Sequence, residues 1–236
     1  MRTFIWFCYF WLSLLGTIPS LRKVERMTAD DQAEARNQLI DDVATRWSSN
    51  LLSLAGCQVT VIGEEHIPKD QTVLFVGNHQ SNFDIPILLT YIKGTKGFIA
   101  KKELEKMPII NQWMRAINCV FMDRDNLRQS AIAINQGIKF LKAGTSMVVF
   151  PEGTRSRDGE PLEFKQGALK LATKSGVPVV PVTIKGSVDI MASGSLKIKP
   201  AKVEVIFSPP IDSKDYPEKE TLRITEDVKN IIVSKL

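Results

Sequence analysis

The chain has 236 residues, of which 44% are hydrophobic and 24% are charged, and its formal net charge is +5. This size and composition suit one globular domain with a sizeable core, plus an appendage. The positive charge indicates an anionic partner. The chain has no zinc-finger spacing, RNA-reading aromatic motif or strongly basic helix, which argues against nucleic acid and favours a membrane surface or a phosphorylated substrate. The three cysteines, Cys8, Cys57 and Cys119, include no CxxC pair, so neither a disulfide framework nor a zinc site is indicated and a reducing compartment is expected.

The stretch from Phe4 to Leu21 carries no charged residue and reads as a membrane segment. Spanning a bilayer takes about 20 apolar residues. Because Gly16 and Pro19 weaken the last turn, insertion into one leaflet remains an alternative to a full span. A cleaved signal peptide is a rival interpretation, but no A-x-A site follows, so we predict a retained anchor. Three basic residues come next and are placed to contact anionic head groups: Arg22, Lys23 and Arg26.

A second long helix is predicted from Thr28 or Asp30 to about Leu54, ending at Gly56. Its apolar positions recur every three or four residues: Leu39, Ile40, Val43, Trp47, Leu51 and Leu54. With the first segment it would form a membrane-anchoring helical hairpin over residues 1–56. Ordinary core packing of this second helix is an equally open interpretation.

Residues 57–236 are predicted to form an α/β domain, because short apolar strands alternate with helical stretches. This pattern indicates a largely parallel central sheet flanked by helices, with chemistry gathered at the strand ends. Pro178 and Pro181 argue against a central strand for residues 177–184 and favour an edge strand or the wall of an apolar channel. The predicted strands are Gln58–Ile62, Thr72–Val76, Gly97–Ala100, Val120–Met122, Met147–Phe150, Val179–Ile184 and Val203–Phe207, and an amphipathic helix is predicted within Glu218–Leu236.

The sequence NHQSNFD, from Asn78 to Asp84, follows one of these strands and precedes a helix that Pro86 favours in its first turn. His79 and Asp84 are five residues apart, so they meet only if His79 lies on the incoming loop. A carboxylate that holds one imidazole nitrogen leaves the other free to accept a proton, which makes His79 a candidate general base. The alternative is a histidine that only hydrogen-bonds the loop.

Arginines follow two other predicted strands and indicate an anion site. Arg124 comes after Val120–Met122, and PEGTRSRDGE places Glu152, Gly153 and Arg155 after the strand that ends at Phe150. A guanidinium can donate two parallel hydrogen bonds to phosphate oxygens. Glu152 is positioned to bind the guanidinium of Arg155 or to accept a hydrogen bond from a substrate hydroxyl. Lys165 precedes a further helix and either adds to this positive field or is an ordinary surface residue. A solvated charged turn is the alternative for the whole loop.

Four motifs in order resemble those of the 1-acylglycerol-3-phosphate (lysophosphatidic acid) acyltransferases of the glycerolipid acyltransferase family. NHQSNFD resembles the first motif, NHxSxxD, and VFMDRDN is similar to the second. FPEGTRS matches the third, and VPVVPVTI looks like the fourth. The N-terminal apolar hairpin also resembles that of bacterial members. The chain departs from the family pattern at Gln80 and Met122.

The resemblance implies that His79 deprotonates a glycerol 2-hydroxyl while Asp84 orients and supports it. The hydroxyl would attack the thioester of acyl-CoA or acyl-acyl-carrier-protein directly, giving phosphatidic acid without an acyl-enzyme, so Ser81 and Cys119 need not be nucleophiles. The family needs no metal or prosthetic group. The residues implied in binding the substrate phosphate are Lys101 (or its neighbour Lys102), Arg124, Glu152, Gly153 and Arg155.

Three alternatives stay open at this point. A related acyltransferase would use glycerol-3-phosphate, a lysophospholipid or a lipo-amino acid as acceptor. A membrane-bound hydrolase would use water, although the chain has no G-x-S-x-G nucleophile elbow. A non-enzymatic lipid-binding protein is the third. Because acyl thioesters are cytosolic, we expect the catalytic domain on the cytoplasmic face of the cell membrane.

Overall fold

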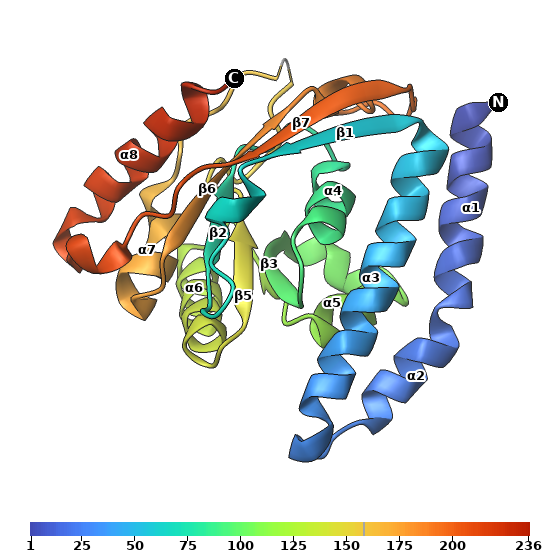
Figure 1. The fold of residues 1–236 in the computed structure, drawn as a ribbon, viewed down its shortest axis with the longest axis horizontal. Helices are drawn as coiled ribbons and strands as arrows, with labels where there is room; N and C mark the ends of the chain where they lie inside the picture. The colour runs from blue at the N-terminus through green and yellow to red at the C-terminus, as the bar shows by residue number, and fades with distance from the viewer. Residues whose placement is uncertain (158) are drawn as a thin grey trace.

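The computed structural model describes residues 1–157 and 159–236 and contains a seven-stranded sheet with helices on both faces (Figure 1). The strand order is β1-β7-β6-β2-β5-β3-β4, and every neighbouring pair is parallel except β6 and β7. The α/β fold class and the seven predicted strands are confirmed. The strands are β1 (Cys57–Ile62), β2 (Leu74–Gly77), β3 (Lys96–Lys101), β4 (Val120–Met122), β5 (Ser146–Val149), β6 (Val179–Lys185) and β7 (Ala201–Phe207).

Both faces of the sheet are buried at the inner strands β2, β5 and β6, because successive strand residues point to opposite sides and each side carries helices there. In β1 and β7, alternate residues are exposed. In β2, Phe75 packs into the cluster that contains residues of α3, α4 and α5, whereas Leu74 and Val76 pack into the cluster of α6, α7 and α8. The predicted C-terminal helix is confirmed as α8. The helices of the α/β domain are α4 (Asp84–Tyr91), α5 (Ile110–Ala116), α6 (Leu127–Lys142), α7 (Gln166–Ser175) and α8 (Thr221–Val233).

The N-terminal segment is a helical hairpin in which α1 (Arg2–Gly16) and α2 (Ile18–Arg26) run along α3 (Ala33–Ala55) (Figure 1). Trp6 Nε1 donates to Leu51 O at 2.9 Å, which ties α1 to α3. Gly56 ends α3 with a φ of 81°, a conformation that favours glycine. Core packing of this helix is confirmed, since α3 pairs with α1 and also packs against α4 within the core, while the membrane-anchoring role of the hairpin stays a prediction.

One helical stretch among the residues that the structure describes, Arg2–Arg26, is long and apolar enough to cross a membrane. It bends between α1 and α2 (Figure 1), where Pro19 supplies no N–H to the helical ladder. At 1.5 Å per residue, α1 alone is about 22 Å long. Its outward side leaves a continuous set of apolar side chains in solvent: Phe4, Ile5, Trp11, Leu12 and Leu15.

The prediction that prolines keep residues 177–184 out of the middle of the sheet was wrong. Strand β6 lies between β7 and β2, and Pro181 is one of its residues. Pro178 O accepts from Leu74 N at 3.0 Å, so by alternation the groups of Pro181 face β7 rather than β2. There Pro181 O accepts from Ser208 N at 2.9 Å, just beyond the end of β7. The missing N–H therefore removes no bond to β2.

A buried lysine joins the hairpin to the α/β domain. Lys96 is 2% exposed, and its Nζ donates to the carbonyls of Leu89 and Ile92 at the end of α4. Its Nζ is also 3.3 Å from Asp41 Oδ1 on α3. Burial lowers the pKa of the Lys96 ammonium, while the ion pair with Asp41 opposes that shift.

This lysine gives a prediction for stability against pH. Between the lowered pKa and the ordinary value of 10.5 the unfolded chain binds more protons at Lys96 than the folded chain does. The contribution of Lys96 to the free energy of unfolding therefore rises with pH across that window. We expect the difference between wild type and Lys96→Met, measured by urea unfolding in detergent from about pH 7 upward, to grow in favour of wild type. A difference that stays constant with pH would contradict the shift.

Candidate active site

The loop between β2 and α4 is fixed at its start by the Asn78 side chain, whose amide pairs with the backbone of Ile184 in β6. Asn78 Nδ2 donates to Ile184 O at 2.8 Å, and Ile184 N donates to Asn78 Oδ1, also at 2.8 Å. Asn78 is 1% exposed, so both bonds are shielded from water. The chain therefore leaves the sheet at a defined place, immediately before His79.

His79 and Asp84 meet as predicted, because α4 begins at Asp84 and His79 lies on the incoming loop. His79 Nδ1 is 2.6 Å from Asp84 Oδ2. The same oxygen accepts from Gln80 N at 2.8 Å and Ser81 N at 3.0 Å, and Asp84 is fully buried. An ionised carboxylate is an acceptor only, so it fixes the histidine in the tautomer that carries its proton on Nδ1.

The imidazole ring of His79 is also held by a contact with its face. The His79 ring stacks on Phe150 with ring centroids 4.2 Å apart and an interplanar angle of 14°. The His79 side chain is 15% exposed and lines a cavity, and no residue that the structure describes hydrogen-bonds to its Nε2. The arrangement leaves one unprotonated ring nitrogen available to a ligand in that cavity. Phe150 was not predicted as a site residue, although it directly precedes the PEGTRS motif.

Ser187 completes the environment of Asp84 and was missed by the sequence analysis. It follows β6 and is fully buried, and its hydroxyl donates to Asp84 Oδ1. Gln80 Oε1 lies 3.4 Å from the same hydroxyl and is the weaker of its two possible acceptors. Both carboxylate oxygens of Asp84 are thereby occupied. Nothing in the sequence around Ser187 distinguishes it from other serines, since only the fold brings it to the catalytic loop.

We expect Ser187→Ala to lower kcat roughly tenfold, since it removes a hydrogen bond to a buried carboxylate. The Michaelis constant for the acceptor should stay the same, because Ser187 does not line the cavity. Ser213→Ala is the matched control: Ser213 is 1% exposed and its hydroxyl donates to Ala172 O, at a buried position outside the catalytic loop. Steady-state kinetics with both variants decide the point, and an unchanged kcat in Ser187→Ala would show that Asp84 needs no such support.

Glu152 is 3% exposed, and its two carboxylate oxygens connect the loop of His79 to the segment at Leu162. Oε1 accepts from His79 N at 2.6 Å, and Oε2 accepts from Leu162 N at 2.9 Å. Burial raises the pKa of Glu152, and these two N–H groups counteract the rise. Glu152 does not line the cavity. Its contact with a substrate phosphate stays a prediction, whereas its hold on the His79 loop is directly visible.

The predicted cations converge on the cavity that His79 lines. Arg155, Arg124 and Lys101 all line it, although they come from three different strand ends. Arg124 Nη1 donates to Gly153 O, and burial lowers the pKa of Arg124. Gly153 has a φ of 72°, which favours glycine in this turn. Lys101 is 59% exposed and its Nζ is 3.1 Å from Glu103 Oε1, at the mouth of the site.

Lys165 lies on the opposite border of the PEGTRS turn. It precedes α7, and its N donates to Pro151 O at 2.9 Å. Its side chain passes close to Gly153, since a Cβ built on that glycine would be 3.2 Å from Lys165 Nζ. Lys165 therefore contributes positive charge to the turn without lining the cavity.

The cavity measures about 530 Å³ and is apolar away from its charged end. Cys119 lies in its wall, and burial raises the pKa of the thiol to about 12, so this cysteine is not a ready nucleophile. Ser81 is equally unsuited, because its hydroxyl donates to Met191 O at 2.8 Å. Helices α1, α3 and α5 supply apolar walls through Leu14, Val43, Trp47, Trp113 and Met114.

Within the described residues, no group of three or more histidine, cysteine, aspartate or glutamate side chains is arranged to hold a metal ion. The site combines an imidazole, two buried carboxylates and three cations beside an apolar cavity.

Comparison with known proteins gives a consistent result. A family described as Acyltransferase matches residues 58–185. A probable 1-acyl-sn-glycerol-3-phosphate acyltransferase of Mycoplasma pneumoniae is 35% identical over 231 residues, covering 93% of this chain and 85% of that protein. The 1-acyl-sn-glycerol-3-phosphate acyltransferase of Borreliella burgdorferi is 33% identical over 186 residues, covering 78% and 74%. The crystal structure of the 1-acyl-sn-glycerophosphate (LPA) acyltransferase PlsC from Thermotoga maritima superposes with a TM-score of 0.85 at 32% identity, covering 100% of this chain and 96% of that chain.

Proposed function

Since this chain belongs to the Acyltransferase family, we propose that it transfers a fatty acyl group from a thioester to the 2-hydroxyl of 1-acylglycerol-3-phosphate, giving phosphatidic acid. One observation carries the proposal: the His79–Asp84 pair and three cations line one cavity that is otherwise apolar. A substrate with one phosphate and one acyl chain needs both kinds of surface beside the reacting hydroxyl.

In the proposed reaction, His79 Nε2 accepts the proton of the acceptor hydroxyl as its oxygen attacks the thioester carbonyl. The C–O bond forms, the tetrahedral oxyanion collapses, and the C–S bond breaks. The proton on His79 then passes to the thiolate, so the thiol leaves neutral and the histidine is restored. Asp84 stabilises the imidazolium and keeps Nε2 aimed at the cavity.

The acceptor phosphate is proposed to bind Arg155, Arg124 and Lys101. Arg155 and Arg124 supply fork-shaped donors that match phosphate oxygens, whereas Lys101 adds an exposed positive charge. Glu152 and Gly153 shape the turn that presents these groups. The same cavity has room for an acyl chain along Trp47, Trp113 and their apolar neighbours. Acyl-CoA and acyl-carrier-protein are both suitable donors for this chemistry.

The experiment that tests this function compares acceptors under one set of conditions. Purified protein in detergent is given acyl-CoA or acyl-carrier-protein with lysophosphatidic acid, glycerol-3-phosphate, lysophosphatidylcholine or no acceptor, and lipid products are identified by mass spectrometry. We expect phosphatidic acid from lysophosphatidic acid as the main product. If another acceptor gave the main product, that acceptor would be the substrate instead of lysophosphatidic acid. Thiol release without any acceptor would indicate a hydrolase.

We propose further that α1 lies within one leaflet and that the catalytic domain faces the cytoplasm. Helix α1 is about 22 Å long, shorter than the roughly 30 Å hydrocarbon core of a bilayer. Its exposed apolar side extends along its length rather than around it.

This orientation gives a topology prediction. A reporter enzyme that is active only in the cytoplasm should be active when it is fused after Leu236, because the acyl donors are cytosolic. A reporter that is active only after export should be inactive at the same position. A matched fusion to a known cytoplasmic protein and one to a known exported protein calibrate the signal. Export of the C-terminal reporter would place the catalytic domain on the wrong side for these donors and contradict the proposal.

A further inference from the structure

We propose that the connection between β6 and β7 is a second membrane contact, which binds anionic lipid head groups beside α1. The contact surface, called here the lysine loop, consists of residues 190–199. This inference rests on the proposed membrane association and adds a surface that fixes how the protein lies on the bilayer. The lysine loop is separate in sequence from the anchor helix and from the reacting groups.

The lysine loop is firmly attached at its base. Lys199 N donates to Ile190 O at 3.0 Å, which closes the loop, and Ile190 is fully buried. Ser81 Oγ donates to Met191 O at 2.8 Å, so the loop starts on the segment that carries the catalytic histidine. These contacts fix where the tip of the loop leaves the body of the protein.

The other side of the loop rests on the first turn of α1. Ile198 N donates to Thr3 Oγ1 at 3.1 Å, and Ile198 is 4% exposed in the cluster that also contains Trp6. A Cβ built on Gly56 would meet both the Arg2 guanidinium and the Pro200 ring, which places the end of the loop beside the start of the helix. The loop and the proposed anchor therefore form one continuous surface.

The tip of the loop has the composition of a lipid-binding surface. Leu196 is 70% exposed, and on the adjoining turn of α1 Phe4 is 74% exposed. Residues 185–202 contain four lysines and one acidic residue, Asp189. Three of the lysines make no ion pair with any residue that the structure describes: Lys197, Lys199 and Lys202. An exposed leucine followed by the unpaired Lys197 and Lys199 suits the boundary between acyl chains and anionic phosphates.

This placement has a consequence for the reaction. Because Met191 and Thr3 connect the lysine loop to the catalytic segment and to α1, contact at both points sets the catalytic segment at the membrane surface. A lipid acceptor then reaches the cavity without leaving the bilayer region. Helix α8 lies on the opposite side of the molecule from α1 and provides matched control positions (Figure 1).

The apolar part of the contact is tested with Leu196→Asp against Leu222→Asp. Leu222 is 55% exposed on α8, so both substitutions place a carboxylate at an exposed leucine. Full-length protein is co-sedimented with vesicles of phosphatidylcholine containing half phosphatidylglycerol, and the partition constants are measured. We expect Leu196→Asp to reduce partitioning about tenfold, since it loses an inserted side chain and adds repulsion. Leu222→Asp should match wild type.

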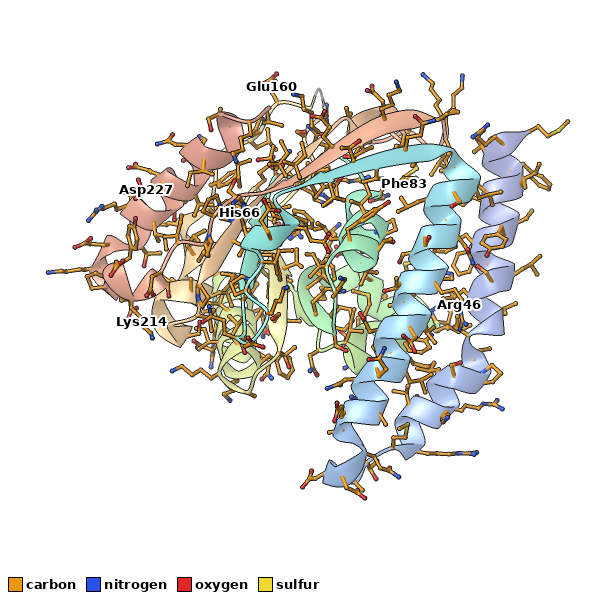
Figure 2. All side chains as sticks on the ribbon, in the orientation of Figure 1. Arg46, His66, Phe83, Glu160, Lys214 and Asp227 are labelled. Carbon is orange, nitrogen blue, oxygen red and sulfur yellow. The ribbon has the colours of Figure 1, made fainter. Side chains whose placement is uncertain are left out.

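The charged part is tested with the double variant Lys197→Ala and Lys199→Ala. Lys214→Ala with Lys219→Ala is its control, and Figure 2 shows Lys214 on the side of α7 and α8. Each lost lysine should weaken binding to the anionic vesicles about fivefold, and the loss should shrink at high salt. Pure phosphatidylcholine vesicles should not distinguish the pairs.

The vesicle experiments distinguish a failure of the lysine loop from a failure of the proposed membrane association. Activity in detergent micelles and the thermal midpoint confirm that each variant is folded. If wild type does not bind vesicles, the membrane proposal itself is wrong. If wild type binds but the loop variants partition as their controls do, only the lysine loop is excluded.

Discussion

Replacing His79 by alanine is expected to lower kcat by roughly 100- to 10,000-fold, the range that general acid–base catalysis contributes. The variant keeps the cavity and its cations but has no group that takes the proton from the acceptor hydroxyl. Binding should change little, because the residues proposed to contact the phosphate lie at other strand ends. The measurement is the initial rate of acceptor-dependent thiol release at saturating substrates.

The chain offers a matched control for this variant, because it contains only one other histidine. His66 Nδ1 is 2.9 Å from Phe207 O, beside β7, and His66 does not line the cavity. His66→Ala should retain the turnover of wild type. Asp84→Asn should lose nearly as much as His79→Ala, and the double variant should lose little more, since the pair acts as a unit. Near-normal turnover in His79→Ala would exclude it as the base.

Replacing Arg155 by alanine is expected to raise the Michaelis constant for the acceptor about 10- to 100-fold, the effect of losing charged hydrogen bonds to a phosphate. Arg155 lines the same cavity as His79, so the lost contact concerns the bound lipid rather than the loop fold. The constant for the acyl donor should stay close to that of wild type. Rates measured across a range of each substrate separate the two constants.

Arg157 is the control for this second variant, since it belongs to the same loop but is exposed and does not line the cavity. Arg157→Ala should bind the acceptor as wild type does. If Arg155→Ala instead lost affinity for the donor alone, Arg155 would belong to the donor site and the proposed phosphate pocket would need other residues.

The contact between His79 and Asp84 was predictable because it depends on short-range geometry. A strand, a loop and a helix start fix where the six residues from His79 to Asp84 can go, and Pro86 marks the helix start. The seven strands were predictable for the same reason, since each is a short apolar stretch with polar boundaries. These features are local, so a single sequence contains the information that specifies them.

The features that sequence reasoning missed depend on the arrangement of distant segments. Ser187 reaches Asp84 only because β6 lies beside β2, and the resemblance itself assigned no role to it. Pro181 was interpreted by a rule for central strands that ignores which neighbour its missing N–H faces. In each case the decisive fact is which strand lies beside β6, and the local sequence pattern does not reveal that strand order.

Glu152 illustrates the same limit at the active site. Its position after β5 suggested a partner for Arg155 or for a hydroxyl, whereas its oxygens accept from the backbone of His79 and Leu162. The carboxylate is thus part of the frame that holds the catalytic loop. The cavity is a property of the packed helices as well, since α1, α3 and α5 each supply only part of its wall.

In the proposed reaction, the acceptor hydroxyl attacks the thioester directly under the control of His79. The most direct measurement is the ratio of thiol released to phosphatidic acid formed, followed from the first turnover with wild-type protein. We expect equal amounts of the two at all times and no thiol when lysophosphatidic acid is left out. A burst of thiol equal to the amount of enzyme in the absence of acceptor would reveal an acyl-enzyme and contradict direct transfer.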